Sequence, residues 1–446
     1  MNYKEAVAYL ESFPPMKEKP SLQRIKLFFE ESGDPQNSID TIHVGGTNGK
    51  GSTALTVEAL IRALGLKTGR FTGPHMFTWR ERIAINGETI SEADFGRLAG
   101  EIKILSEQFG AKHPELGVLS WFEVLTAMAF FKFKEENIDV AVMEVGLGGR
   151  FDATNAADRV IGTIITNIDL EHTHILGDTV EKIAFEKAGI MKAGVKVTTG
   201  ARGDALEELR RQAALKNTEL VEASETFTSD SPFISCKEEI LADLALVGPH
   251  QRTNSLLALT MLAQAKRFQA ARFADAAAID RMRKALASLI WPGRFQLVED
   301  KQLILDVAHN PASAKVLRRA LDQFSSGNYL FVVGFFRSKD VPGFLENLLR
   351  KGDRVIACNL NTRRKFYRAR EIKAICQDLS IECSTARDVI LGMRQAARLH
   401  APGQYTVATG SFEVVRSTMR YLGWHPDVVA RTFNNSPVTD PRGVKG

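Results

Sequence analysis

The sequence predicts an α/β protein with mostly parallel sheets and at least two domains. Short apolar runs alternate with segments of helix length, which is the pattern of strands joined by crossover helices. The chain has 446 residues, and chains of this length seldom build one hydrophobic core. Length therefore predicts two or three domains and at least one cleft between them.

Composition is typical of a globular protein and argues against several other classes. Lysine plus arginine exceed aspartate plus glutamate by 58 − 53 = 5, and 44% of the residues are hydrophobic. This balance disfavours disorder and nucleic acid as a partner. The four cysteines lack CxxC spacing, which favours reduced thiols over a disulfide framework or a zinc site. Charge appears early in the N-terminal segment and no apolar run approaches about 18 residues, so we expect a cytoplasmic protein without a membrane partner.

The first part of the chain predicts a large domain. Its apolar runs indicate strands over residues 39–44, 67–71, 138–143, 160–165 and 195–198. Amphipathic stretches over 91–108 and 121–133 are long enough for crossover helices. The dipeptide Asn86-Gly87 lies between apolar residues and predicts a two-residue hairpin turn.

A second, smaller α/β unit is predicted after a helix-rich stretch over 254–290. The sequence WPGRF at 291–295 breaks any helix, so we place the junction there and expect domains over 1–295 and 296–446. Further strands are predicted over 303–307, 329–334, 354–358 and 405–408. The tail after Trp424 is polar enough to fray.

The strongest chemical signal is GGTNGKGS at 45–52, between an apolar strand and the helix-compatible run 53–64. Glycines allow a tight turn to aim backbone N–H groups at phosphate, and Lys50 supplies a positive charge for the outer phosphates. The spacing differs from a strict Walker A loop, because position 44 is Val and Gly51 separates Lys50 from Ser52. The alternative is a glycine-rich turn that only begins a helix.

Two further signals follow predicted strands. Glu144 begins EVGLGGRFDATN, and an acid at the carboxyl end of a buried strand beside a phosphate loop can hold Mg²⁺. The alternative is a solvated carboxylate, although GLGGR keeps the backbone close and presents Arg150 toward the site. His172 and His174 lie among acids and are either metal ligands or surface histidines.

Three other features are ambiguous from the residues alone. Lys187 lies near a helix end closed by Gly189, where a cation is favourable for structural reasons. The turn DVAHNPAS at 306–313 follows a strand and should face a ligand, or Asn310 only caps the helix that Pro311 begins. The basic stretch 363–370 either binds an anion or is a solvated loop.

Eleven motifs in order together resemble the folylpolyglutamate synthases and dihydrofolate synthases of the Mur ligase superfamily. They are SLQRI (21–25), GTNGKGS (46–52), TGPH (72–75), ERI (81–83), EVGLGGRFDATN (144–155), EHTHILG (171–177), EKAGI (186–190), HQRTN (250–254), WPGRF (291–295), DVAHNP (306–311) and TGS (409–411). The resemblance implies a P-loop-containing ATPase domain of the Mur ligase type and a smaller Rossmann-like C-terminal domain. It also implies an active site in the cleft between them.

The resemblance further implies the roles of individual residues. Those expected to bind ATP are Thr47, Asn48, Gly49, Lys50, Gly51, Ser52, Asn254, Arg294 and Asp306. Two Mg²⁺ ions are implied, with Ser52, Glu144, His172 and a carbamylated Lys187 as the metal-binding residues. The catalytic residues are then Lys50, Lys187, His172 and Glu144, and those implied for substrate binding are Arg150, Asp152, His309 and Ser411.

The implied reaction joins L-glutamate to a folate-type acid through an acyl phosphate, with release of ADP and phosphate. The implied partners are small molecules, and the implied state is a monomer. Three positions depart from the family pattern: Gly73 where relatives carry serine, Glu171 where aspartate is usual, and Val307 where glycine is usual. Val307 raises a question about the local backbone, because valine does not readily adopt a positive φ.

Two alternatives remain at this point. Another Mur-type ligase, acting on a different acid such as a peptidoglycan precursor, would share the ATP and metal residues but lack SLQRI and WPGRF. A nucleotide-dependent switch or binding module would need neither Lys187 nor DVAHNP. The residues leave open whether dihydropteroate, tetrahydrofolate or both are substrates.

Overall fold

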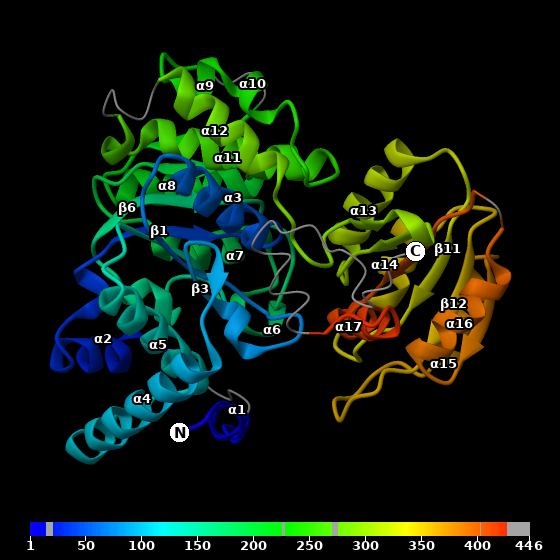
Figure 1. Ribbon diagram of the computed structural model, residues 1–446, viewed down its shortest axis with the longest axis horizontal. Helices are drawn as coiled ribbons and strands as arrows, with labels where there is room; N and C mark the ends of the chain where they lie inside the picture. The colour runs from blue at the N-terminus through cyan, green and yellow to red at the C-terminus, as the bar shows by residue number, and fades with distance from the viewer. Residues whose placement is uncertain (15–20, 225–227, 270–274, 402, 426–446) are drawn as a thin grey trace, which may run out of the picture. The chain divides into compact units, whose positions relative to one another are not determined.

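A computed structural model describes residues 1–14, 21–224, 228–269, 275–401 and 403–425. The chain divides into two compact units, each an α/β arrangement around its own sheet (Figure 1). The first comprises Met1–Leu244 and Gln251–Leu289, and the second comprises Ala245–His250 and Ile290–Gly446. The predicted fraying of the tail concerns residues that lie almost entirely outside the described part.

The first unit contains an eight-stranded sheet in the order β4-β3-β2-β5-β1-β6-β7-β8. All neighbours from β2 to β8 are parallel, whereas β3 and β4 form an antiparallel edge. The strands are β1 Asp40–Gly45, β2 Thr68–Phe71, β3 Ile83–Ile85, β4 Glu88–Thr89, β5 Val140–Glu144, β6 Val160–Ile165, β7 Val197–Thr199 and β8 Leu220–Glu222. Both central strands β1 and β5 are buried along their whole length, as expected for a sheet covered on both faces.

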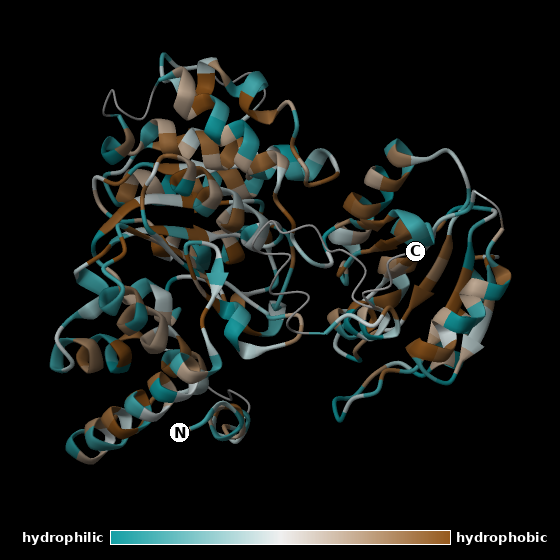
Figure 2. Cartoon of the chain, in the orientation of Figure 1, coloured by the Kyte–Doolittle hydropathy of each residue, from teal (hydrophilic) through white to brown (hydrophobic). Residues whose placement is uncertain are grey.

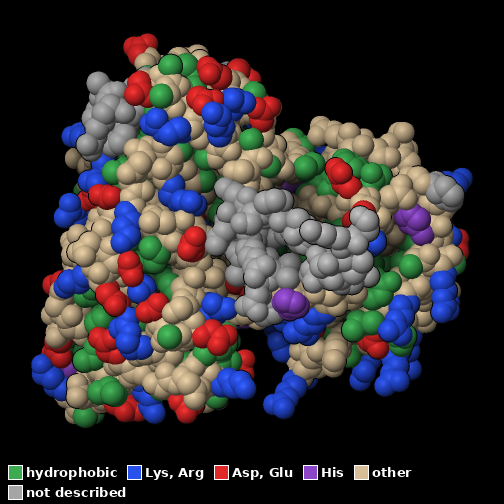
Figure 3. Space-filling model, viewed as in Figure 1, with side chains coloured by type: hydrophobic (Ala, Val, Ile, Leu, Met, Phe, Trp, Pro, Cys, Tyr) green, Lys and Arg blue, Asp and Glu red, His purple; other side chains and the backbone are tan. Residues whose placement is uncertain are grey.

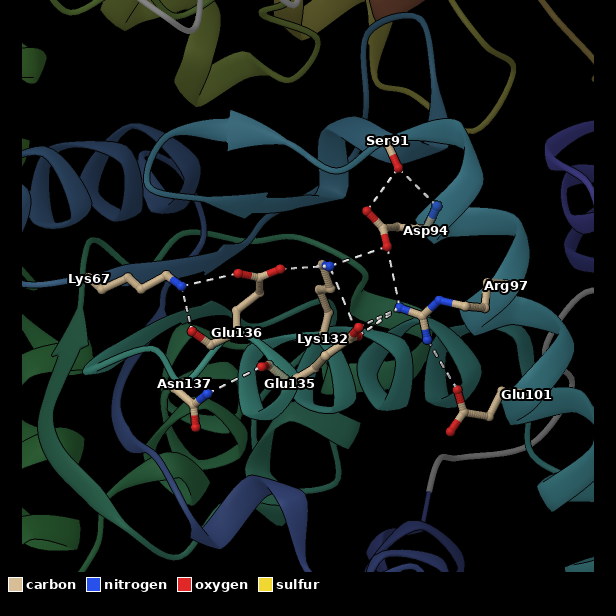
Figure 4. Close-up of polar contacts among 9 residues, drawn as sticks. All are labelled: Lys67, Ser91, Asp94, Arg97, Glu101, Lys132, Glu135, Glu136 and Asn137. Atoms are coloured by element: carbon tan, nitrogen blue, oxygen red, sulfur yellow. Dashed lines mark hydrogen bonds and ion pairs between the residues drawn. The ribbon is translucent and has the colours of Figure 1, made fainter.

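Helices cover both faces of this sheet. The helices of this unit are α1 Tyr3–Glu11, α2 Leu22–Glu31, α3 Lys50–Ala63, α4 Glu92–Lys112, α5 Trp121–Glu135, α6 Thr173–Leu176, α7 Val180–Lys187, α8 Asp204–Leu215, α9 Pro232–Ser235, α10 Lys237–Leu241, α11 Pro249–Gln264 and α12 Ala276–Ala287. Ser91 and Ser120 accept backbone N–H bonds at the starts of α4 and α5, which explains where these helices begin. Around Lys132, an ion-pair network joins α4 to α5 at the surface (Figure 4).

The second unit contains a six-stranded sheet in the order β13-β12-β11-β14-β10-β9. Its strands are β9 Gln296–Val298, β10 Leu303–Leu305, β11 Leu330–Val333, β12 Arg354–Cys358, β13 Glu382–Ala386 and β14 Thr406–Thr409, with only β9 antiparallel. Its helices are α13 Pro311–Phe324, α14 Val341–Leu348, α15 Ala369–Asp378, α16 Val389–Leu399 and α17 Phe412–Tyr421. The strands of both sheets are predominantly hydrophobic (Figure 2).

The structure confirms the predicted α/β class and most predicted strands within two residues. The Asn86-Gly87 hairpin is present, and both residues have positive φ, 50° and 83°, as a two-residue turn of type I′ requires. The division after Leu289 lies a few residues before the predicted junction at 295. The physical reason is that WPGRF bonds to the second sheet: Val307 donates its N–H to the Gly293 carbonyl and Phe295 donates to Asp306.

Candidate functional site

The phosphate loop occupies the turn between β1 and α3, at the carboxyl end of the sheet. Gly46 and Gly49 have φ of 130° and 84°. A Cβ at Gly46 would lie 1.8 Å from the Thr166 hydroxyl, and one at Gly49 would lie 2.5 Å from Asn254 Oδ1. Both glycines are therefore required by conformation and by close packing. Asn254 itself lies on α11 and donates to Gln251.

Hydrogen bonds fix the shape of this loop before the start of α3. Thr47 and Asn48 donate their backbone N–H groups to the carbonyl and the side chain of Asn167. The Lys50 ammonium donates to the carbonyls of Gly46 and Thr47, at 3.0 and 2.9 Å. The first N–H groups of a 14-residue helix and one lysine thus converge on the same turn, as an anion site requires. Gly51 and Ser52 are buried in the first turn of that helix.

Lys187 is drawn into the same loop rather than left at a helix surface. Its side chain is only 2% exposed, and its ammonium donates to the Gly46 carbonyl at 2.8 Å and to Glu171 at 2.7 Å. Burial lowers the pKa of Lys187 to about 8, against the opposing effect of Glu171. Burial raises the pKa of Glu171, but the charges of Lys50 and Lys187 outweigh it and lower that pKa. Lys187 is the last residue of α7, as the local pattern predicts, but its ammonium binds the phosphate loop and Glu171.

Glu144 ends β5 and is buried, with one carboxylate oxygen accepting the Gly73 N–H at 3.0 Å. Arg82 lies beside it, with its guanidinium 5.1 Å from the Trp79 ring and 5.6 Å from the Trp121 ring. Burial lowers the pKa of Arg82 to about 10, although Glu144 opposes this shift. A Cβ at Gly73 would come within 2.7 Å of that guanidinium. Glycine at this departure from the family pattern therefore suits a closely approaching arginine.

A buried ion pair that the motif analysis missed supports this edge. Arg70 on β2 binds Glu58 on α3 at 2.5 Å, and both side chains are 1% exposed. Arg70 also donates to the Thr72 hydroxyl, and Glu58 accepts the Gly87 N–H. The pair fixes the phosphate-loop helix to the turn that contacts Glu144. Arg70 lies in a short run, TGRF, which carries no sequence signal for a partner twelve residues away.

The two histidines lie at the surface. His172 directly precedes α6 with φ of 45°, and its ring lies 6.3 Å from that of His174. Among the residues that the structure describes, no three His, Cys, Asp or Glu side chains converge as a metal cage. Mg²⁺ does not need such a cage, because it usually takes one or two protein oxygens and completes its shell with phosphate oxygens and water. The Glu144 carboxylate and the Ser52 hydroxyl are donors of that kind, so they fit a nucleotide-borne Mg²⁺.

The loop after β5 places Arg150 outward and Asp152 inward. The Arg150 guanidinium lies 4.6 Å from the Phe151 ring and 5.2 Å from the Phe185 ring. Asp152 is buried and accepts N–H bonds from Leu147 and Thr154, and burial raises its pKa. Asp152 therefore fixes the shape of this loop, whereas the Arg150 side chain is exposed at the loop's surface, where it can contact a ligand.

In the second unit, the predicted residues lie at the carboxyl edge of the sheet. Asp306 accepts N–H bonds from Phe295 and Ala308, and burial raises its pKa. His309 bonds through Nδ1 to the Val307 carbonyl, at 2.8 Å. Val307 is not among the described residues with positive φ, so the backbone accommodates valine here.

Arg294 and His309 share one aromatic neighbour. The Arg294 guanidinium lies 5.4 Å from the Phe412 ring, and His309 lies 6.4 Å from the same ring between centroids. Ser411 directly precedes Phe412 and donates its hydroxyl to the Gly334 carbonyl at 2.9 Å. The second unit thus gathers Arg294, His309 and Ser411 at one edge.

Among the helices that the structure describes, none is long and apolar enough to span a membrane.

Comparisons with known proteins identify a matching family and similar chains. Residues 293–412 match the family described as Mur ligase, glutamate ligase domain. The chain is 33% identical over 366 residues to the dihydrofolate synthase/folylpolyglutamate synthase of Bacillus subtilis, covering 78% of this chain and 82% of the relative.

Solved structures match at the level of the whole chain. The Mycobacterium tuberculosis folylpolyglutamate synthase complexed with ADP superimposes with a TM-score of 0.82 at 29% identity, covering 95% of this chain and 99% of that one. A bifunctional folylpolyglutamate synthase/dihydrofolate synthase with Mn, AMPPNP and L-glutamate bound gives a TM-score of 0.79 at 29% identity, covering 95% and 98%. The chain belongs to the folylpolyglutamate synthase/dihydrofolate synthase family, the ATP-dependent ligases of the Mur ligase type that attach glutamate to folate-type acids.

Proposed function

We propose that this enzyme uses ATP and Mg²⁺ to join L-glutamate to the carboxylate of dihydropteroate, of tetrahydrofolate polyglutamates or of both. The observation that carries the proposal is the phosphate loop, where Lys50 and Lys187 both bond to the Gly46 carbonyl beside the start of α3. A solved relative of similar fold holds a nucleotide analogue, Mn and L-glutamate together, which correspond to ATP, Mg²⁺ and the amino-acid substrate of the proposed reaction. The proposed partners are these small molecules, and the proposed state is a monomer.

The reaction needs an activated acid because a carboxylate is a poor acyl donor. A carboxylate oxygen of the folate-type acid attacks the γ-phosphorus of ATP, and ADP leaves, which gives an acyl phosphate. The neutral amine of L-glutamate then attacks the acyl carbon, the C–O bond to phosphate breaks, and the nitrogen loses a proton. Lys50 and the N–H groups at the start of α3 offset the negative charge that accumulates during phosphoryl transfer.

Ser52 and Glu144, which carry hard oxygen donors, would hold one Mg²⁺ together with the nucleotide. His172 and a carbamylated Lys187 would hold a second ion. When bound, these ions neutralise charge on ATP and on the anionic acid. Arg82 contributes further positive charge beside Glu144, and the Arg70–Glu58 pair keeps the turn at Thr72 in place.

Lys187 is proposed to act as a carbamate. A neutral amine attacks CO₂, forms an N–C bond and releases a proton, which turns a cation into an anion suited to a metal. The lowered pKa of Lys187, about 8, supports this capture because it increases the neutral fraction near neutral pH. Once carbamylated, Lys187 would repel Glu171, so a cation would be needed beside them, and a second Mg²⁺ would supply that charge.

The remaining predicted residues divide between nucleotide and substrates. Asn254, Arg294 and Asp306 are assigned to ATP, with Arg294 available to a phosphate. Arg150, Asp152, His309 and Ser411 are assigned to the acid and to glutamate. Asp152 and Asp306 act mainly through the loops that they hold, because each carboxylate is already engaged with backbone N–H groups.

A substrate panel tests the proposal. The enzyme is incubated with Mg–ATP and labelled L-glutamate, and with dihydropteroate, tetrahydrofolate or a peptidoglycan precursor acid in turn. We expect label in an acid-amide product, and ADP release, only with a folate-type acid. Equal ADP release without any acid would contradict the ligase assignment, and product from the peptidoglycan precursor alone would select another Mur-type ligase.

A further inference from the structure

One strongly charged surface of the second unit has no part in the reaction described above. Six cations are concentrated in two segments that follow β11 and β12; we name this surface the basic ribbon, comprising Phe336, Arg337 and residues 363–370. Its cations are Arg337, Arg363, Arg364, Lys365, Arg368 and Arg370. Residues 363–370 contain no acid, and the cations there are exposed. Lysine and arginine side chains gather on the lower part of this unit in Figure 3.

The ribbon is an exposed loop whose backbone is held by hydrogen bonds. Phe336 and Phe366 form an antiparallel bridge. Arg337 donates its N–H to the Lys365 carbonyl at 3.0 Å, and Tyr367 donates to the Phe335 carbonyl at 2.9 Å. These bonds hold the two segments side by side, so the spacing of the cations is fixed by the backbone.

Aromatic rings also hold individual cations in place. The Arg364 guanidinium lies 4.2 Å from the centre of the Phe336 ring, and Arg368 lies 4.9 Å from that of Phe366. Arg337 lies 4.5 Å from the Tyr367 ring and pairs with Glu371 at 2.8 Å. Stacked guanidinium groups lose less conformational freedom when an anion binds.

The ribbon lies at the same sheet edge as His309 and Ser411, two of the residues that are predicted to bind substrate. Strands β12, β11, β14 and β10 are neighbours in this order, and the ribbon follows β11 and β12 whereas Ser411 follows β14. The Ser411 hydroxyl bonds to the carbonyl of Gly334, two residues before the ribbon begins at Phe336. In parallel sheets the carboxyl ends of neighbouring strands form one continuous ligand-binding edge. The ribbon therefore extends the edge on which Ser411 and His309 lie.

We propose that the basic ribbon binds the γ-linked oligoglutamate tail of the folate-type ligand. This inference rests on the proposed function. Each γ-glutamyl residue leaves one free α-carboxylate, so a tail of several residues is a polyanion with regularly spaced carboxylates. Guanidinium groups bind carboxylates through paired N–H bonds, and an ordered row of them suits such a chain.

Equilibrium binding to the full-length enzyme, loaded with Mg²⁺ and a non-hydrolysable ATP analogue, tests this assignment. The ligands are folate with one glutamate and folate with five, and the measured quantity is the ratio of their Kd values. The variant is Arg363→Gln/Arg364→Gln/Lys365→Gln. The matched control, Arg319→Gln/Lys351→Gln/Arg398→Gln, removes three exposed cations elsewhere in the same unit.

Wild type and control are expected to bind the pentaglutamate roughly tenfold more tightly than the monoglutamate, with the preference falling as salt rises. The ribbon variant should lose this preference while its monoglutamate Kd stays within about twofold. The inference would be overturned if wild type bound the two ligands equally well, or if the variant lost affinity for both ligands to the same extent. A changed Kd for the ATP analogue alone would assign the ribbon to phosphate instead. Failure of the proposed function is seen separately, as absence of glutamate incorporation by wild type.

Discussion

The two sheets present charge at their carboxyl edges in different ways. In the first unit, charged side chains are buried and bind one another or the phosphate loop, as Lys187 with Glu171 and Arg70 with Glu58 do. In the second unit, the buried Asp306 binds backbone N–H groups, and the cations lie outside on the basic ribbon. Burial strengthens electrostatic interactions and fixes geometry, which phosphoryl transfer needs. Exposed cations suit recognition of a soluble anion.

The largest expected effect comes from the first edge. Lys50→Ala removes a phosphate contact that strengthens as charge moves in the transition state, so kcat should fall by about a thousandfold. Steady-state kinetics with saturating ATP measures this change. Lys196→Ala, which removes a half-exposed lysine on the same unit, is the matched control and should retain normal kcat. A Lys50→Ala enzyme with near-normal kcat would contradict the assignment of phosphoryl transfer to the carboxyl edge of the first sheet.

Lys187 tests whether the buried lysine is chemical or structural. Lys187→Ala should lower kcat at least about a hundredfold, and Lys187→Arg should not restore it, because arginine keeps the positive charge that a carbamate removes. Acetate or formate should restore part of the activity of Lys187→Ala by occupying the vacated space. Activity of Lys187→Ala within a few-fold of wild type would refute the carbamate.

A buried histidine makes the first unit sensitive to acid. His43 on β1 bonds through Nε2 to Thr154 at 2.7 Å, and burial lowers its pKa to about 3. Its contribution to stability is complete above the unfolded pKa of 6.5 and is lost as pH falls through that value toward 3. Between pH 7 and pH 5, wild type should lose about 2 kcal/mol of unfolding free energy more than His43→Gln. At pH 7 the difference in unfolding free energy between wild type and His43→Gln reports the substitution itself, because His43 is neutral in both the folded and most of the unfolded chains. A difference that stays constant between pH 7 and pH 5 would contradict this assignment.

The smallest expected effect concerns a cap in the second unit. Asn310 accepts the Ser313 N–H at the start of α13, so Asn310→Ala should cost about 1 kcal/mol of unfolding free energy. Asn310→Ser keeps a capping hydroxyl and is the matched control. Urea unfolding measures both. If Asn310→Ala and Asn310→Ser lower kcat equally, without a difference in stability, the residue has a chemical role beyond its cap.

Sequence patterns were sufficient for elements with a local signal. Strand β6 and strand β12 lie where the apolar runs predict them, and Gly46 and Gly49 of the phosphate loop have positive φ, which suits the tight turn that the motif predicts. Strand β13 was not predicted, because its residues ECSTA are mostly polar and only half-buried at the sheet edge. Its pairing with β12 is a tertiary contact that overrides the weak strand propensity of that run.

Long-range partners were the part that the sequence left undetermined. The sequence around Lys187 predicts only a cation at a helix end, and the fold brings it to Gly46, which is 141 positions away. Arg82 likewise reads as part of a short motif, whereas its position between Trp79 and Trp121 depends on packing between separate elements. Side-chain periodicity reports which face of an element is buried, but it does not report what lies opposite.

The central claim is that the first unit activates an acid as an acyl phosphate, and isotope transfer tests it most directly. The folate-type acid is prepared with ¹⁸O in the reacting carboxylate and incubated with Mg–ATP and L-glutamate. The carboxylate oxygen that attacks phosphorus leaves with it when the amide forms. Mass analysis of the released phosphate should therefore find one ¹⁸O atom for each amide bond formed. Phosphate without ¹⁸O, released together with amide product, would contradict the account.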